Sequence, residues 1–146
     1  IYIPYHNYAF DGGSLDYDTL LPLGHPNPDY MRYELHRVWV VEANLKPGER
    51  HVYGKRTFYL DEDSWLFVAI DSYDNRGEIY RMGILNSVYH YAVDGYIART
   101  QFFFDLQAGH YLASRLINTT GQPLVNAEFE KPEYFTPSNL RRMGRR

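Results

Sequence analysis

Hydrophobic and polar residues alternate through the middle of the chain with the period of two that is typical of β-strands. Six such stretches follow one another, at 35–45, 50–60, 65–73, 78–91, 96–105 and 110–118. Short segments rich in turn-forming residues separate them, and short turns can join only antiparallel neighbours. The pattern therefore predicts one curved, six-stranded antiparallel meander over 35–118.

The predicted turns contain the residues that tight connections require. In 46–49, Pro47 and Gly48 take the second and third places of a type II turn. The 74–77 segment ends on Gly77, which suits a type I turn followed by a residue in the left-handed region. Asp94-Gly95 is a strong hairpin signal. Each strand is therefore predicted to pair with the next one along the chain.

The segments on either side of the meander are less regular. Residues 1–34 begin with a short strand and continue as a long loop, whose Pro residues cannot join the interior of a strand ladder. Residues 119–146 contain a loop, a candidate additional strand at 124–129 and a short helix that begins at Thr136. The three parts form one domain. Because the chain starts on the strand-like Ile1-Tyr2-Ile3, we expect it to be a fragment of a longer protein.

A sheet of this size has a face that must be covered, and nothing within the chain supplies an adequate cover, because a long amphipathic helix is missing. We expect a second sheet, another segment of the same protein, a partner or a ligand to fill that role. The predicted fold is mainly β, a curved antiparallel meander or open half-barrel with one or two short helices.

Composition narrows the class of protein. Apolar residues make up 45% of the 146 residues and aromatic residues 17%, which excludes a disordered chain. Arg141, Arg142, Arg145 and Arg146 lie in the last six residues, and the rest of the chain has 11 Lys and Arg against 18 Asp and Glu. An acidic body argues against nucleic-acid binding, and the basic end is read as a solvated terminus. No apolar run is long enough for a membrane helix.

The polar residues form no recognisable catalytic or metal-binding motif. The sequence has no cysteine, no HExxH pair among its six histidines and no G-x-S-x-G elbow. Asp61, Glu62 and Asp63 fall at a predicted turn, where water should solvate them. We therefore expect no metal, no cofactor and no enzyme activity, with a hydrolase as the weakest alternative.

Aromatic and long apolar side chains on the predicted strands are the remaining candidates for function. They form either an ordinary core or a lining for an acyl chain or similar apolar ligand, to which each buried methylene contributes about 0.8 kcal/mol. The predicted ligand-binding residues are Trp39, Phe58, Phe67, Tyr80, Met82, Phe102 and Phe104.

Segments along nearly the whole chain resemble one known family. Residues 33–43 are similar to the segment RYELHRVWVVEA of the DUF1329 family, and the resemblance continues through 51–56, 58–65, 73–77, 105–113, 135–137 and 140–146. The match corresponds to roughly the C-terminal third of the family's full-length proteins, which begin with a secretion signal.

The resemblance implies a location and a type of fold, but no catalytic residues. The family is of unknown function, occurs in Gram-negative proteobacteria and is similar to the LolA and LolB carriers, which hold acyl chains against an open half-barrel. Its members are often encoded beside exporters of the resistance-nodulation-division type. The resemblance therefore implies a periplasmic or outer-membrane-associated protein without a transmembrane segment.

Two functions from different classes follow. In the first, the chain is part of a carrier or exporter accessory that binds a hydrophobic or lipid-like molecule. In the second, it is an interaction or structural module whose sheet face docks on a partner, either the N-terminal remainder of the same protein or another envelope protein.

Overall fold

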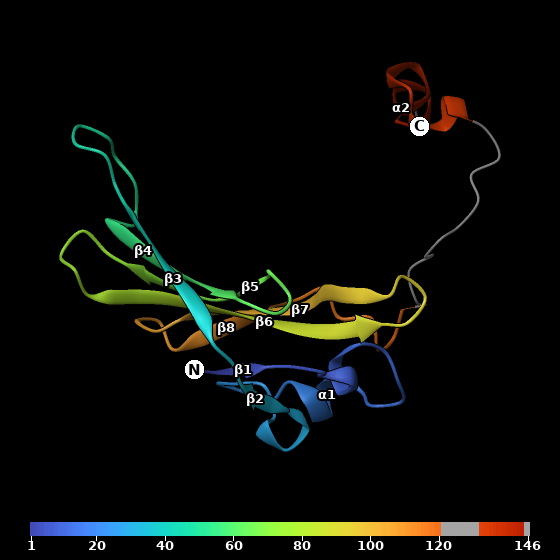
Figure 1. Cartoon of the computed structure of the whole chain (residues 1–146), viewed down its shortest axis with the longest axis horizontal. Coiled ribbons are helices and arrows are strands. Elements are labelled where there is room, and N and C mark those ends of the chain that lie inside the picture. The colour runs from blue at the N-terminus through green and yellow to red at the C-terminus, as the bar shows by residue number, and fades with distance from the viewer. Residues whose placement is uncertain (121–131, 145–146) are drawn as a thin grey trace.

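The computed structural model describes residues 1–120 and 132–144. Its main element is one antiparallel sheet whose strands pair in the order of the sequence. The strands are β3 (Val38–Asn44), β4 (Lys55–Asp61), β5 (Phe67–Tyr73), β6 (Ile79–His90), β7 (Gly95–Asp105) and β8 (His110–Ser114). The sheet is curved, and β3 and β8 form its two free edges, so it does not close (Figure 1). The predicted open, mainly β meander is confirmed.

The turns form as their residues predict. Between β3 and β4, Glu49 N donates to Lys46 O at 3.1 Å, and Gly48 has a φ of 87°. Between β5 and β6, Gly77 N donates to Asp74 O at 3.1 Å, with Gly77 at a φ of 84°. A side chain at either glycine would be strained in this left-handed region, so these residues fix the register of the flanking hairpins.

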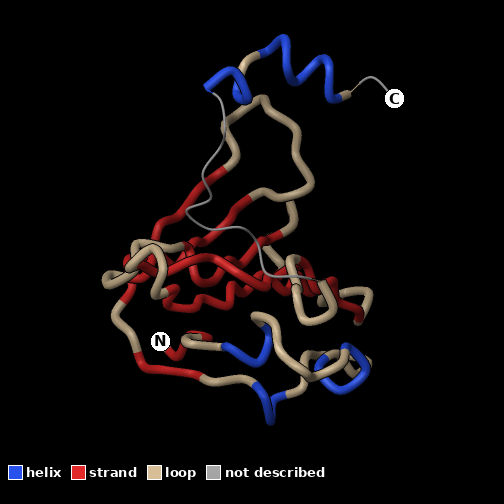
Figure 2. The backbone as a smooth tube through the Cα atoms, turned by 90° about the vertical axis from the view of Figure 1, so that its right-hand side faces the viewer, coloured by secondary structure: helices blue, strands red, loops and turns tan. Residues whose placement is uncertain are grey.

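The first 35 residues form a layer below the sheet. Strands β1 (Tyr2–Pro4) and β2 (Tyr33–Leu35) pair with each other in a separate two-stranded sheet. Between them lie η1 (Tyr8–Phe10), α1 (Tyr17–Leu20) and η2 (Pro28–Tyr30). Figures 1 and 2 show from two directions that this segment lies against one face of the large sheet only.

Side chains from this N-terminal layer build the core. One buried cluster joins Ile3 and Tyr5 to Val68 of β5, and a second joins Phe10 and Leu20 to Phe102 of β7. The expectation that nothing within the chain covers the sheet is therefore wrong for one face. The covering residues are scattered among prolines and glycines, so they have no periodic pattern.

Polar contacts fasten the same layer to the sheet. Thr100 Oγ1 donates to Phe10 O at 2.9 Å, and Tyr111 Oη donates to Pro22 O at 2.9 Å. Arg99 Nε lies 2.7 Å from Asp11 Oδ1, and both side chains are about nine-tenths buried. Burial raises the pKa of the Asp11 carboxyl, although the Arg99 guanidinium opposes that shift.

The C-terminal part consists of η3 (Pro132–Phe135) and α2 (Pro137–Met143). The predicted start of this helix is confirmed, because the Thr136 hydroxyl accepts a bond from Asn139 N at 3.3 Å and Pro137 opens the helix. The candidate strand at 124–129 lies outside the described residues. Across 1–120 and 132–144, none of the helices has the length and apolar character needed to cross a membrane.

Candidate functional site

The two faces of the large sheet can be told apart from its register, since directly paired residues point to the same side. One row crosses the sheet on the face that the N-terminal layer covers. Its members, in strand order, are Val40, Tyr59, Ala69, Ile84, Phe102 and Ala113. The neighbouring row points to the opposite face, and every one of its members is apolar or glycine. We call it the apolar row: Val41, Phe58, Ile70, Gly83, Phe103 and Leu112.

The apolar row is left open to solvent within the described residues. Phe103 is 44% exposed and Leu112 60%, whereas Phe102, the residue before Phe103, is fully buried. Trp39 and Phe67 both pair with Leu60, a strand position that shares the face of Phe58, and both are more than half exposed. Contiguous exposed apolar surface of this extent is characteristic of a binding face.

The centre of this face is hollowed into a shallow pocket of about 130 Å³. Phe58 and Phe67 lie on one side of it and Phe103 on the other, with Gly83 between them. A Cβ atom at Gly83 would lie 2.7 Å from Ile70 Cγ2. The hollow therefore depends on the missing side chain, and even alanine would force Ile70 to move.

The structure separates the seven residues predicted from sequence to bind a ligand. Trp39, Phe58 and Phe67 lie together on the open face. Phe102 is in the core, and Met82 pairs with Phe104 on the covered side. Tyr80 lies away from the hollow, with its ring 6.0 Å from that of Tyr53 and the Arg81 guanidinium 4.5 Å above it.

The sequence did not predict other residues of the open face, of which Phe103 and Leu112 are the most important. Phe102, Phe103 and Phe104 follow one another in β7, so hydrophobicity alone does not show which of them faces the core. The β4–β5 register also shifts between Tyr59 and Leu60, which turns Val68 toward the core. A pairing diagram built outward from the β6–β7 turn would have placed Phe102 opposite Gly83, because the register shifts between Leu85 and Ser87 before Phe103 takes that place.

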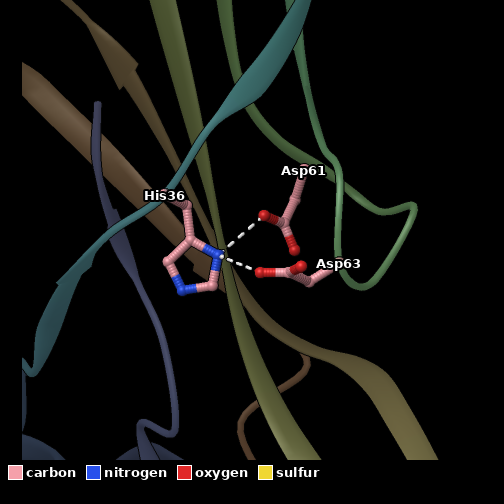
Figure 3. A group of neighbouring side chains, drawn as sticks. All are labelled: His36, Asp61 and Asp63. Carbon is pink, nitrogen blue, oxygen red and sulfur yellow. Dashed lines mark hydrogen bonds and ion pairs between the residues drawn. The ribbon is translucent and has the colours of Figure 1, made fainter.

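A second constellation lies where β2 leads into β3. His36 Nδ1 is 2.8 Å from Asp61 Oδ1 and 3.2 Å from Asp63 Oδ2, as Figure 3 shows. The Tyr5 ring lies against the imidazole, with 4.2 Å between ring centroids. Asp61 also accepts bonds from Ser64 N at 2.9 Å and Ser64 Oγ at 2.6 Å.

Asp61 corrects one prediction made from sequence. Water was expected to solvate all three carboxylates of the turn, but Asp61 is fully buried. Burial raises the pKa of the Asp61 carboxyl, but the hydrogen bonds from Ser64 and His36 outweigh it, so the pKa lies below its usual range. His36 and Asp61 come together because Val38 pairs with Asp61 in the first hairpin, a register that local sequence patterns do not give.

One nitrogen and two carboxylate oxygens of His36, Asp61 and Asp63 lie within 4.8 Å of one another, which is the spacing of a metal site. The fully buried Asp61 carboxylate already has hydrogen-bond partners in His36 and Ser64. This saturation is typical of a structural hydrogen-bond cluster that joins the end of β2 to the β4–β5 turn. The absence of a metal therefore stays a prediction, and the cluster requires no ion to explain it.

Comparison with known proteins places the chain in a family. A family model described as "Protein of unknown function (DUF1329)" matches residues 1–141. The chain belongs to the DUF1329 family. An uncharacterised Pseudomonas aeruginosa protein, PA3922, is 44% identical over 146 residues, which are 99% of this DUF1329 chain and 32% of that protein. This DUF1329 chain thus spans about a third of the length of its relative.

Two crystal structures resemble part of this DUF1329 chain. One is a putative outer membrane lipoprotein-sorting protein domain from Vibrio parahaemolyticus, with 21% identity and a TM-score of 0.43 over 70% of this chain and 41% of that one. The other is a DUF1329 family protein from Desulfovibrio piger, with 16% identity and a TM-score of 0.44 over 70% of this chain and 40% of that one.

Proposed function

We propose that the open face of the sheet binds a hydrophobic or lipid-like molecule, and that the chain serves as a non-enzymatic carrier or exporter accessory of the Gram-negative envelope. The observation that carries the proposal is the unbroken apolar row, which crosses all six strands and is exposed at Val41, Phe103 and Leu112. A face whose central row has no polar side chain suits a ligand held by burial and not by directional bonds. The periplasm or the outer-membrane periphery is the proposed location.

The energetics favour an elongated ligand over a compact one. A pocket of about 130 Å³ is far smaller than the cavities of several hundred Å³ that enclose drug-sized molecules. An extended chain lying along the apolar row could instead contact the side chains of several strands at once. At about 0.8 kcal/mol per buried methylene, a chain of roughly ten such groups gains about 8 kcal/mol, which exceeds the lower estimates, about 4 kcal/mol, of the cost of association.

A second function rests on a different observation, the outer edge of the sheet. Strand β3 exposes side chains on both of its faces, with Trp39 at 56% and Val40 at 59% exposure. A free edge with apolar residues on both sides is a place where another chain can add a strand. The partner would be the remainder of the full-length protein or another envelope protein, and this module would then be structural.

Titration with N-phenyl-1-naphthylamine, an uncharged apolar fluorophore, separates the two functions. A carrier face binds the fluorophore, and Phe103→Gln weakens binding about tenfold, because the lost apolar contact is worth about 1.5 kcal/mol. The matched control is Leu23→Gln, at a loop position that is fully exposed and outside the pocket lining.

Native mass spectrometry before and after solvent extraction supplies a readout that needs no probe. The carrier proposal expects an extractable apolar molecule on protein purified from a Gram-negative periplasm. A chain that carries no such molecule, binds no fluorophore and is captured only with a protein partner would overturn the carrier and favour the docking module.

A further inference from the structure

The open face is not uniformly apolar, and its polar margin indicates what kind of molecule fits it. The row two residues along each strand from the apolar row contains Arg56, Ser72, Arg81, Asp105 and His110, each paired with the next across the sheet. Direct pairing puts these residues on the same face as Phe58 and Phe103. The face therefore has an apolar centre and, two residues further along each strand, a polar and charged border.

The two arginines of this border are in different electrostatic situations. Arg81 Nε donates to Asp105 Oδ2 at 3.0 Å, and its Nη1 donates to Tyr53 Oη at 3.2 Å, so its charge is already matched. Arg56 has no carboxylate within ion-pair distance among the described residues. Its guanidinium lies instead over two rings, 5.5 Å from the centroid of Phe58 and 5.9 Å from that of Tyr53.

Arg56 also borders a second hollow, formed by the β3–β4 hairpin, which Figure 1 shows rising on the open side of the sheet. This hollow, which we call the hairpin pocket, has a volume of about 350 Å³. Its charged lining is Lys46, Glu49, Arg50, Lys55 and Arg56. Four cations thus face one anion, although the chain as a whole has a formal charge of −3.

Most of the positive charge of the hairpin pocket is not neutralised by the protein. Lys55 Nζ lies 3.7 Å from Glu42 Oε1, but no carboxylate of the described residues is within ion-pair distance of Lys46, Arg50 or Arg56. Uncompensated cations around a hollow attract an anionic group, and Arg in particular binds carboxylates and phosphates through paired N–H donors. Arg56 lies between this pocket and the apolar row, because it lines the former and contacts Phe58 of the latter.

From this juxtaposition we infer that the ligand is an anionic amphiphile, whose phosphate or carboxylate head binds in the hairpin pocket while its tail lies on the apolar row. The inference rests on the proposed apolar-ligand function and adds the chemistry of the head group. Arg56 is the residue that couples the two halves of the site. Lys46 and Arg50, which are exposed in the hairpin loop, draw the head group in.

Displacement of N-phenyl-1-naphthylamine by three compounds below their micellar concentrations tests the inference. Dodecyl phosphate, tridecanoate and dodecan-1-ol have the same twelve-carbon tail and differ only at the head. We expect both anions to displace the fluorophore at roughly tenfold lower concentration than the alcohol, since one charge-assisted contact of this kind is worth about tenfold in affinity. Raising the salt concentration reduces that preference.

Variants assign the preference to the pocket. Arg56→Gln should remove most of it, and the exposed Lys46→Gln, which does not risk the fold, should reduce it in part. The matched control is Arg37→Gln, which removes an equal charge from an exposed side chain that pairs with Glu62 at 2.7 Å outside the pocket. That variant should retain the full preference.

Each other outcome has a definite meaning. If the alcohol and the anions displace the fluorophore equally well, the head-group inference is overturned and the carrier proposal stands. If inorganic phosphate binds as tightly as dodecyl phosphate, the pocket takes a free anion and the amphiphile is excluded. If the fluorophore does not bind at all, both proposals fail together.

Discussion

The covered and open faces of the sheet are built from the same strands, yet they differ in what their apolar residues do. Phe102 meets Phe10 edge to face, at 5.5 Å between ring centroids, whereas the next residue, Phe103, faces solvent. Hydrophobic content is similar on the two sides, so it does not explain the difference. The covered side acts as a core because residues 1–35 pack on it, and the open side has no such layer in the described part of the chain.

The largest expected effect comes from truncating each of these two phenylalanines in turn. Phe102→Ala should lower the free energy of unfolding by about 3–5 kcal/mol, since it leaves a cavity in the packed core. Phe103→Ala should cost less than about 1 kcal/mol, because that side chain is already in contact with water. Urea denaturation followed by circular dichroism measures both. Equal losses would mean that the open face is packed in solution and would remove the contrast.

The next effect concerns the attachment of the covering layer. Arg99→Met leaves the buried Asp11 carboxylate without its guanidinium, and we expect a loss of about 3 kcal/mol at neutral pH. The loss should shrink on acidification, because the Asp11 carboxyl has a raised pKa and becomes protonated readily. The control is Arg37→Met, whose exposed ion pair with Glu62 should contribute less than about 1 kcal/mol. A pH-independent loss in Arg99→Met would contradict the electrostatic account.

The smallest expected effect tests the cluster that joins the two layers at β2. The pKa of the Asp61 carboxyl is lower in the folded state, so its charged form stabilises the protein above the unfolded pKa of about 3.9. That stability is lost as the pH falls through the folded pKa. Asp61→Asn should therefore cost about 1–2 kcal/mol at pH 7, and the difference from wild type should close toward pH 3.

Asp63→Asn is the matched control for this measurement, because Asp63 lies in the same turn but its side chain is 74% exposed. We expect it to change the free energy of unfolding by less than about 0.5 kcal/mol at any pH. The comparison of wild type and variant at each pH is the relevant readout, since hydrogen bonds also hold the pKa of the Asp105 carboxyl low and contribute to acid sensitivity.

The meander could be predicted from the sequence because its two signals, strand alternation and turn residues, are both local. Alternation defines a strand within a few residues, and the conformation of turns such as 46–49 and 74–77 is determined by the residues of the turn itself. The N-terminal layer was not recognised, since Ile3, Phe10 and Leu20 have no common period. Their burial depends on contacts between residues that are far apart in the sequence. Within the same layer, for example, Tyr5 N donates to Arg32 O at 3.1 Å.

Only part of the candidate site could be predicted from the sequence, because the rest depends on contacts between residues that are far apart in the chain. Trp39, Phe58 and Phe67 could be named from their residue type, but the side of the sheet on which a residue lies depends on register. Three register shifts, at Tyr59/Leu60, Ser72/Tyr73 and Leu85/Ser87, interrupt the simple alternation. The hairpin pocket went unnoticed because its cations are spread over 46–56 and converge only when the loop folds back on itself.

The adjacency of Phe102 and Phe103 limits how the open face can adapt to a molecule that contacts it. The two side chains are attached to successive Cα atoms of β7, so a displacement of the strand at one of them also displaces the other. Phe102 packs against Phe10 in the core, and the middle of the sheet is consequently rigid. If the open face binds an apolar ligand as we propose, ligands of different width would be accommodated at the margins, where β3 is a free edge, and the centre would set where an apolar tail lies.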